Sequence, residues 1–242
     1  EIARAWPYFR AIAEPAPVAA AIEKVQAGDG IESVIEIAFH EGVHPRKGFD
    51  LILEQYGVCR AITSLQQFPG RQGREDCLRR LVRTVHRDLL ESLKRAIERA
   101  EGQVPETDNI PALIAGRDWL FGEHDYYLDT SHVVSVIQFS AETIDPETLA
   151  LTIELADYGK CLSNMFQFKG EPPFENAFID YGIYLRALLG EDVGTAVAHF
   201  RKKVADSDPA QVGTRPAQVL VGLLARRGRY REAIEVSLDH LR

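Results

Sequence analysis

The residues best equipped for chemistry form the segment His40-Glu41-Gly42-Val43-His44. On a continuous helix, two histidines at this spacing share one face and can bind zinc, and the glutamate between them can activate a zinc-bound water. Pro45 follows directly and biases His44 away from helical geometry, while Gly42 weakens the helix between the histidines. We therefore expect the helix to end near Gly42, so that this segment does not form a helical zinc site.

A second polar cluster, residues 123–132, suggests a different use of the same histidines. Its sequence, EHDYYLDTSH, is expected in a turn and at a helix start. If that turn meets the first segment, the two could supply nitrogen and oxygen ligands for zinc or another transition metal. The expected metal ligands are His40, His44, His124 and His132, and the candidates for a further ligand or a general base are Glu41 and Asp129.

An ordinary structural interpretation of both clusters stands beside this hypothesis. Asp129, Thr130 and Ser131 carry the oxygen atoms that commonly cap helix starts. His132 would then lie in a first helical turn, and His44 would make a hydrogen bond within a turn. No other cofactor is expected, because the chain has no P-loop, no GxGxxG and no GxSxG motif.

An aromatic-rich turn is the candidate partner-binding surface. Trp119, Tyr126 and Tyr127 could line a pocket or contact a partner protein, and packing in a core explains them equally well.

The elements that must position these residues are helices. Apolar residues recur along most of the chain at i, i+3, i+4 and i+7, with hardly any strict alternation. Residues 78–97 are the clearest case, and their other face alternates basic and acidic side chains. Asp145 before Pro146 indicates a capped helix start. Gly and Pro clusters elsewhere leave helices of about 10 to 25 residues, so we predict an all-α fold of stacked antiparallel helical hairpins.

The length of 242 residues and the apolar fraction of 45% predict a substantial core. We expect one all-helical repeat domain, residues 1–242. The polar stretch 102–109 could divide it into N-terminal helices, residues 1–101, and C-terminal helices, residues 110–242.

Charge and composition exclude several classes of partner. The 36 acidic and 28 basic residues give a net charge of −8, so nucleic acid is not the expected partner. There is no long apolar run for a membrane span, and residues 1–15 lack the basic and apolar pattern of an export signal, so neither is expected. An odd number of cysteines without CxxC spacing predicts buried free thiols in a reducing compartment, and hence a cytoplasmic location; they are Cys59, Cys77 and Cys161.

A weak internal repeat supports the stacking of similar units. Tyr-Gly dipeptides occur at residues 56–57, 158–159 and 181–182, each expected in the middle of a helix. Since a glycine there costs about 1 kcal/mol relative to alanine, we predict close helix–helix approach beside an aromatic ring. Chance recurrence of a dipeptide is the alternative.

The C-terminal segment 219–234 resembles the second half of a tetratricopeptide (TPR) unit. Gly228, Tyr230 and Ala233 match the Gly-x-Tyr turn of that family and the alanine that packs on the neighbouring helix. The resemblance covers about the last 70 residues and lacks the usual Trp and Tyr of the first helix. A looser copy includes Tyr184, Leu185, Gly190, Ala196 and Phe200.

This TPR-like resemblance implies an α-solenoid whose concave face binds a peptide or partner protein. The leading hypothesis is therefore a non-enzymatic protein-interaction module. The alternative is a metal-dependent enzyme with a site built from the HEGVH and EHDYYLDTSH segments. An uncovered terminal repeat would expose apolar surface, so self-association as a homo-oligomer through an end helix is also expected.

Overall fold

The computed structural model describes residues 1–68, 70 and 72–241, and these form helices and turns but no strand. The predicted all-α fold class is confirmed. The chain divides into two compact units, residues 1–85 and 86–242. Their boundary lies inside one long helix, whereas the polar stretch 102–109 lies within the second unit. No helix in the described residues is both long enough and apolar enough to span a membrane.

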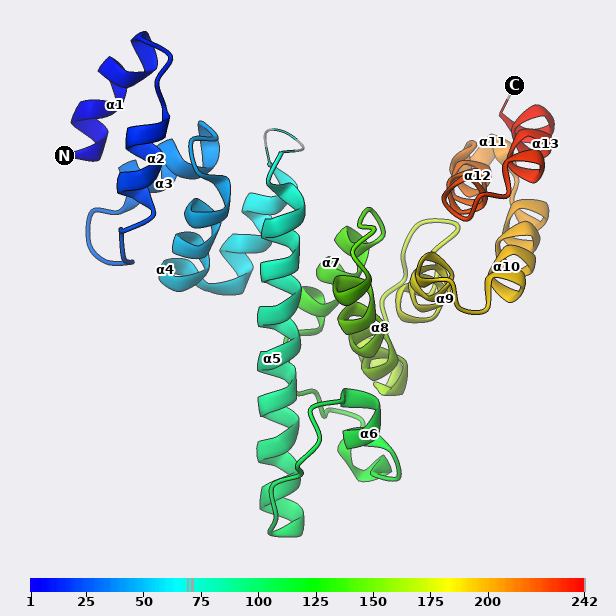
Figure 1. Ribbon diagram of the computed structural model, residues 1–242. Helices are drawn as coiled ribbons and strands as arrows, with labels where there is room; N and C mark the ends of the chain where they lie inside the picture. The colour runs from blue at the N-terminus through cyan, green and yellow to red at the C-terminus, as the bar shows by residue number, and fades with distance from the viewer. Residues whose placement is uncertain (69, 71, 242) are drawn as a thin grey trace. The chain divides into compact units, whose positions relative to one another are not determined.

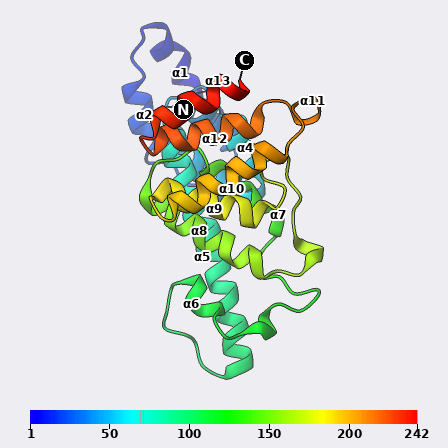
Figure 2. The ribbon, with the colours of Figure 1, turned by 90° about the vertical axis from the view of Figure 1, so that its right-hand side faces the viewer.

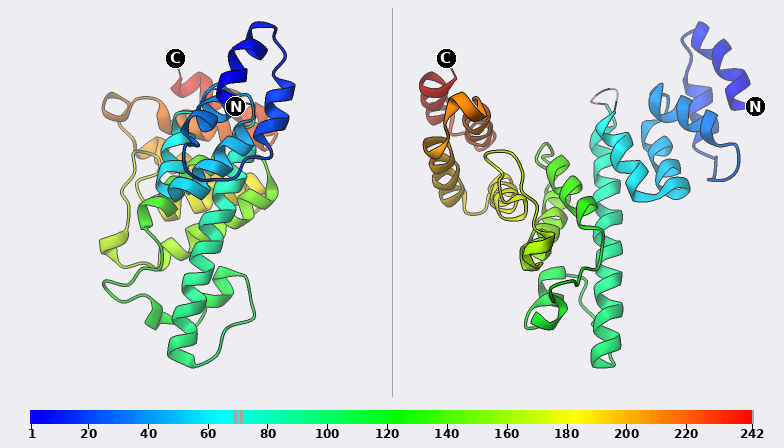
Figure 3. Two further views of the ribbon diagram at one scale, coloured as in Figure 1. Left: turned by 90° about the vertical axis from the view of Figure 1, so that its left-hand side faces the viewer. Right: turned by 180° about the vertical axis from the view of Figure 1, so that it is seen from behind.

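The first unit begins with a small helical hairpin, and a helical turn then packs against a longer helix. Helix α1 contacts α2 and α3, and η1 contacts α4. The ribbon of this unit is blue to cyan in Figure 3. Phe39, Phe49 and Leu65 are fully buried in this unit. Its elements are α1 (Ile2–Ala11), α2 (Ala16–Ile22), α3 (Glu32–Ile35), the π-helical turn η1 (Glu36–His40), α4 (Pro45–Gln66) and the first part of α5 (Arg74–Glu101).

The helix that carries His40 ends as expected. Gly42 has a φ of 77°, and His44 is non-helical, with a φ of −152° and a ψ of 71°, before Pro45 begins α4. A left-handed glycine and a non-helical residue before a proline stop a helix, which confirms its predicted end near Gly42. After the reversal, Gly48 approaches η1 so closely that a Cβ there would lie 2.8 Å from the backbone nitrogen of Phe39.

The second unit is a series of packed helices (Figure 1). The predicted caps are confirmed: Asp129 accepts from the Ser131 N–H at 2.9 Å, and Asp145 accepts from the Thr148 N–H at 3.0 Å. After the remainder of α5, the elements are α6 (Ile110–Ile114), η2 (Asp118–Leu120), α7 (Thr130–Ser140), α8 (Pro146–Cys161), η3 (Asn164–Phe166), α9 (Ala177–Leu189), α10 (Val193–Asp206), α11 (Pro209–Val212), α12 (Arg215–Arg226) and α13 (Tyr230–His240).

Helices of this unit that follow one another also pack together. The successive contacts are α7 with α8, α8 with α9, α9 with α10, and α12 with α13, and α10 also contacts α12. Figure 2 shows α9, α10, α12 and α13 as neighbouring helices. Two further contacts, α7 with α9 and α9 with α12, join the first helices of three hairpins into one row. The packed hairpins agree with the sequence, and a solenoid stays a prediction.

The three Tyr-Gly glycines have different surroundings. Gly159 lies against the ring of Phe178, so that a Cβ would be 2.0 Å from Phe178 Cδ1, and the predicted close approach beside an aromatic ring is confirmed. At Gly182 a Cβ would instead lie 3.3 Å from both Cε and Nζ of Lys160. At Gly57 the prediction is wrong. Its φ of 74° interrupts α4, and no neighbouring atom lies within 4 Å of the position that a Cβ would take there.

Candidate ligand-binding cleft

A cleft of about 680 Å³ lies beside α7, α9 and α12, which are the first helices of three hairpins in the second unit. Its lining comes from the end of α7, from the connection between η3 and α9, and from α9 and α12. This volume is in the range of small-ligand sites. The lining residues are Gln138, Phe139, Ala141, Glu142, Lys169, Gly170, Glu171, Phe174, Tyr181, Tyr184, Arg215 and Val219.

An aromatic cluster supports one side of the cleft. The rings of Phe174 and Tyr181 are stacked with centroids 3.9 Å apart. Tyr184 and Phe200 meet Phe174 edge-on, with centroids 5.7 and 5.6 Å away. All four residues are at most 6% exposed. The packed rings leave little rotamer freedom, so the two tyrosines that line the cleft are fixed in position.

The hydroxyls of Tyr181 and Tyr184 make no hydrogen bond within the described part of the chain. Neither hydroxyl is among the fully buried side-chain oxygens that lack a hydrogen bond in those residues. Both tyrosine hydroxyls therefore contact solvent. Burial raises the pKa of both phenols above the usual value of 10.0. Both hydroxyls are therefore protonated at neutral pH and can donate to a ligand.

Charged side chains lie at the edge of the cleft. Arg215 of α12 forms an ion pair with Glu171, which bridges α12 and the connection before α9. Lys169 is exposed and has no ion-pair partner among the described residues. Backbone hydrogen bonds from Gly170 N–H to Glu175 O at 3.3 Å and from Ala177 N–H to Phe168 O at 3.1 Å close this connection on itself.

Two other contacts fix the helices around the cleft. The guanidinium of Arg226 in α12 donates to the carbonyl oxygens of Ala141 at 2.7 Å and Glu142 at 3.1 Å. It therefore satisfies backbone acceptors at the C-terminal end of α7, where a positive charge is also favourable. The cleft is thus bounded by helices that are joined to each other.

A buried carboxylate holds α9 against α10. Asp180 is 2% exposed and accepts hydrogen bonds from His199 Nε2 at 2.8 Å and from the Asn176 backbone N–H at 2.8 Å. Lys203 Nζ lies 3.2 Å from the same side chain. Burial alone would lower the pKa of Lys203, but its hydrogen bonds to Glu175 and Asp180 raise it above the usual value. This cluster is fully paired and positions α9.

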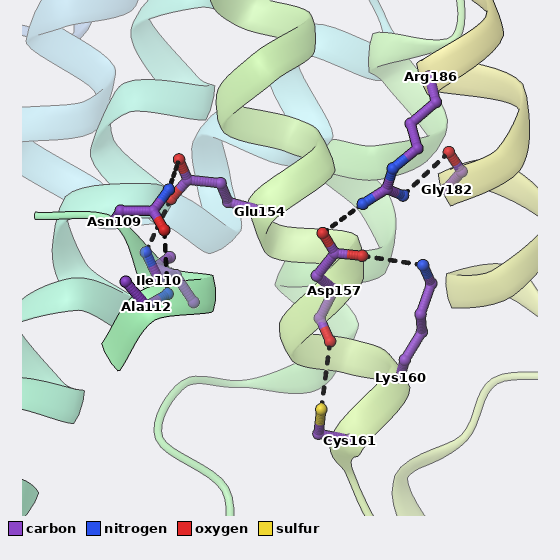
Figure 4. Close-up of polar contacts among 9 residues, drawn as sticks. All are labelled: Asn109, Ile110, Ala112, Glu154, Asp157, Lys160, Cys161, Gly182 and Arg186. Atoms are coloured by element: carbon purple, nitrogen blue, oxygen red, sulfur yellow. Dashed lines mark hydrogen bonds and ion pairs between the residues drawn. The ribbon is translucent and has the colours of Figure 1, made fainter. Parts of the chain in front are cut away.

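A second carboxylate holds α9 against α8 (Figure 4). Asp157 accepts hydrogen bonds from Lys160 Nζ at 2.8 Å and from Arg186, which also donates to the Gly182 carbonyl at 3.4 Å. In both Asp-Tyr-Gly copies, the aspartate thus binds a basic side chain of the next helix. The tyrosine of the second copy, Tyr181, lines the cleft.

The candidate metal ligands of the first cluster have contacts within the first unit. His44 Nε2 lies 2.7 Å from Glu23, and Glu41 accepts from Trp6 Nε1 at 2.9 Å and Arg10 at 2.8 Å. His40 meets Phe39 edge-on, with ring centroids 5.1 Å apart. The side chain of His44, expected to make a hydrogen bond within a turn, instead contacts the carboxylate of Glu23 in another segment.

The candidates of the second cluster belong to the second unit. Asp129 caps α7, and its hydrogen bonds with Ser131 lower the pKa of the Asp129 carboxyl below its usual value. His124 is exposed and His132 half-buried. Within residues 1–68, 70 and 72–241, no three His, Cys, Asp or Glu side chains form a metal-binding group. Metal ligation by His40, His44, His124 and His132 stays a prediction, and the two clusters lie in different units.

The predicted aromatic surface does not line the cleft. Trp119 and Tyr126 are 46% and 54% exposed, and the Tyr126 ring meets that of Phe166 at 5.0 Å. The Tyr127 backbone N–H donates to Tyr158 Oη at 2.9 Å, which ties this turn to α8. The partner-binding role of Trp119, Tyr126 and Tyr127 stays a prediction.

The prediction of buried thiols is right for one cysteine. Cys77 is buried, and burial raises its pKa to about 12. Cys59 and Cys161 are exposed free thiols, so the prediction is wrong for these two. Cys59 follows the break at Gly57, and Cys161 ends α8, so neither continues the apolar face that precedes it.

Only part of the cleft had a signal in the sequence. Tyr181 stood in a repeated dipeptide and Tyr184 in the looser TPR-like copy, but Lys169 and Arg215 were not singled out. The TPR-like turn has the expected local form: Gly228 has a φ of 70°, and Ala233 is 6% exposed. The resemblance itself stays a prediction. No protein-family model, curated protein or solved structure matches this chain.

Proposed function

We propose that this chain is a protein-interaction module that binds a peptide segment in the cleft formed by α7, α9 and α12. The observation that carries the proposal is the pair of fixed tyrosines, Tyr181 and Tyr184, whose hydroxyls reach solvent without a partner in the described residues. Groups that are fixed before binding lose little entropy when a ligand arrives.

A peptide matches the chemistry of the cleft. Its backbone carbonyls can accept hydrogen bonds from the two phenols, and its apolar side chains can contact Phe139 and Val219. Lys169 offers positive charge at the edge, where an acidic side chain of the peptide would be favoured, whereas Arg215 is already paired with Glu171.

The test begins with selection of binders from a random-peptide display library against the purified chain. The dissociation constant of a selected, fluorescently labelled peptide is then measured by anisotropy for the wild type and for Tyr184→Phe. We expect this variant to bind about two- to thirteenfold more weakly, because one hydrogen bond contributes about 0.5–1.5 kcal/mol. Its thermal stability should not fall, since the lost hydroxyl has no partner in the described residues of the free protein.

Tyr126→Phe is the matched control, because it removes the same atom from the aromatic surface outside the cleft. Binding should be unchanged in this variant. A selected peptide whose affinity falls in Tyr126→Phe and not in Tyr184→Phe would show that the aromatic surface is the binding site. The proposal would then be wrong.

A further inference from the structure

The last helix exposes an apolar stripe. Tyr230, Ile234 and Leu238 recur at i, i+4 and i+8 on α13 and are 65%, 60% and 51% exposed. Ala233 and Val236 on another side of the helix are 6% and 5% exposed, and α13 packs on α12. Three large apolar side chains in a row on one helix form a surface that favours association.

Two opposite charges lie along one side of the stripe. Arg231 and Glu235 lie one helical turn apart and are both exposed. Neither has an ion pair or hydrogen bond in the part of the chain that the structure describes. Glu232, by contrast, is bound by Arg201 at 2.7 Å and by Arg229 at 2.6 Å. The stripe is thus bordered by a positive and a negative charge that are both free to contact a partner.

We propose that α13 pairs with α13 of a second copy of this chain, antiparallel and about a two-fold axis. The order of charges on α13 is self-complementary, since reversing the helix direction brings Arg231 beside Glu235 of the second copy, and the symmetry makes this pair twice. In the same register, Tyr230 of the second copy lies level with the space between Ile234 and Leu238. One register of the two helices therefore pairs the charges and also interleaves the apolar side chains.

The pairing surface is small, because each copy contributes one helix face. Interfaces that bury less than about 1,200 Å² in total belong to weak or transient complexes. The dimer is therefore concentration-dependent, and its apolar stripe contributes no residue to the cleft.

Sedimentation equilibrium over a wide range of concentration tests this pairing. The proteins are the wild type, Arg231→Glu, Glu235→Arg, and the double variant that exchanges the two charges. Each single variant converts two attractive contacts into repulsive ones, so its dimer dissociation constant should rise about tenfold. The double variant should return to the wild-type value. Ile234→Asp should be monomeric.

Lys202→Glu on α10 controls for net charge, because Lys202 is exposed and outside the stripe, and it should leave the dissociation constant unchanged. Circular dichroism should show that all variants are folded, since the altered side chains are exposed. A wild type that stays monomeric would overturn the proposal. So would a dimer that the single charge reversals do not weaken, or one that the exchange of charges does not restore.

Discussion

Glu154 shows how one carboxylate can join three segments of the second unit. It accepts hydrogen bonds from His86 Nε2 in α5 at 2.9 Å, from Asn109 Nδ2 at 2.7 Å, and from the Ile110 backbone N–H at 2.9 Å. Figure 4 shows the contacts at the start of α6. Burial alone raises the pKa of Glu154, but these hydrogen bonds hold it below its usual value of 4.5. The ionised carboxylate is therefore part of the fold.

Glu154→Gln should lower the free energy of unfolding of the second unit by about 1–3 kcal/mol, because hydrogen bonds to a charged acceptor are weakened and one buried donor loses its partner. Urea denaturation at neutral pH measures this difference. Glu98→Gln is the matched control, since Glu98 is an exposed residue of α5 whose side chain has no partner in the described residues, and it should have little effect.

The stability difference between wild type and Glu154→Gln should also depend on pH. A carboxyl whose pKa is lowered by folding stabilises the protein fully above its unfolded pKa, and this stabilisation is lost as the pH falls through the folded pKa. The difference should therefore be constant above pH 4.5, the usual value, and shrink below it. A difference that grows as the pH falls below that value would contradict the role of Glu154 described above.

At the scale of elements, two glycines in the middle of helices should respond oppositely to the same substitution. Gly159→Ala forces a methyl into the ring of Phe178 and should cost at least about 1–3 kcal/mol of stability. At Gly222 in α12, no neighbouring atom lies within 4 Å of the new methyl, so Gly222→Ala should stabilise by up to about 1 kcal/mol. Urea denaturation of both variants checks the sign of each effect.

The helices themselves were predictable because their signals are local. Apolar spacing, the Asp129 and Asp145 caps, and the stop at Gly42 all act within a few residues. The cleft was not predictable in the same way, because its lining joins segments from residue 138 to residue 219. Which residues meet depends on how the helices pack. No local sequence pattern indicates that Arg215 reaches Glu171.

The contrast between local signals and long-range packing also explains why the sequence could not settle the role of the histidines. The sequence showed two clusters with suitable donor atoms, but it could not show that they belong to different compact units. Nor could it show the local contacts, in which Glu23 lies beside His44 and Glu41 accepts from Trp6 and Arg10. Donor atoms in a sequence motif indicate that a segment could bind a metal ion. The groups around these atoms decide whether they do so.

For the molecule as a whole, the two compact units should unfold as separate transitions. The chain has one tryptophan in each, Trp6 in the first and Trp119 in the second. In Trp6→Phe, fluorescence reports the second unit, and in Trp119→Phe it reports the first. Gly159→Ala is then added to each of these two variants. It should shift the urea midpoint reported by Trp119 and leave the midpoint reported by Trp6 unchanged. Equal shifts of both would mean one cooperative transition.

The most direct test of the central claim is hydrogen exchange of the whole chain with and without a selected peptide, read by mass spectrometry. Binding in the cleft predicts slower exchange in residues 169–174 and at the end of α7, residues 138–142, with residues 119–127 unchanged. Slower exchange confined to residues 119–127, with no change around the cleft, would contradict it.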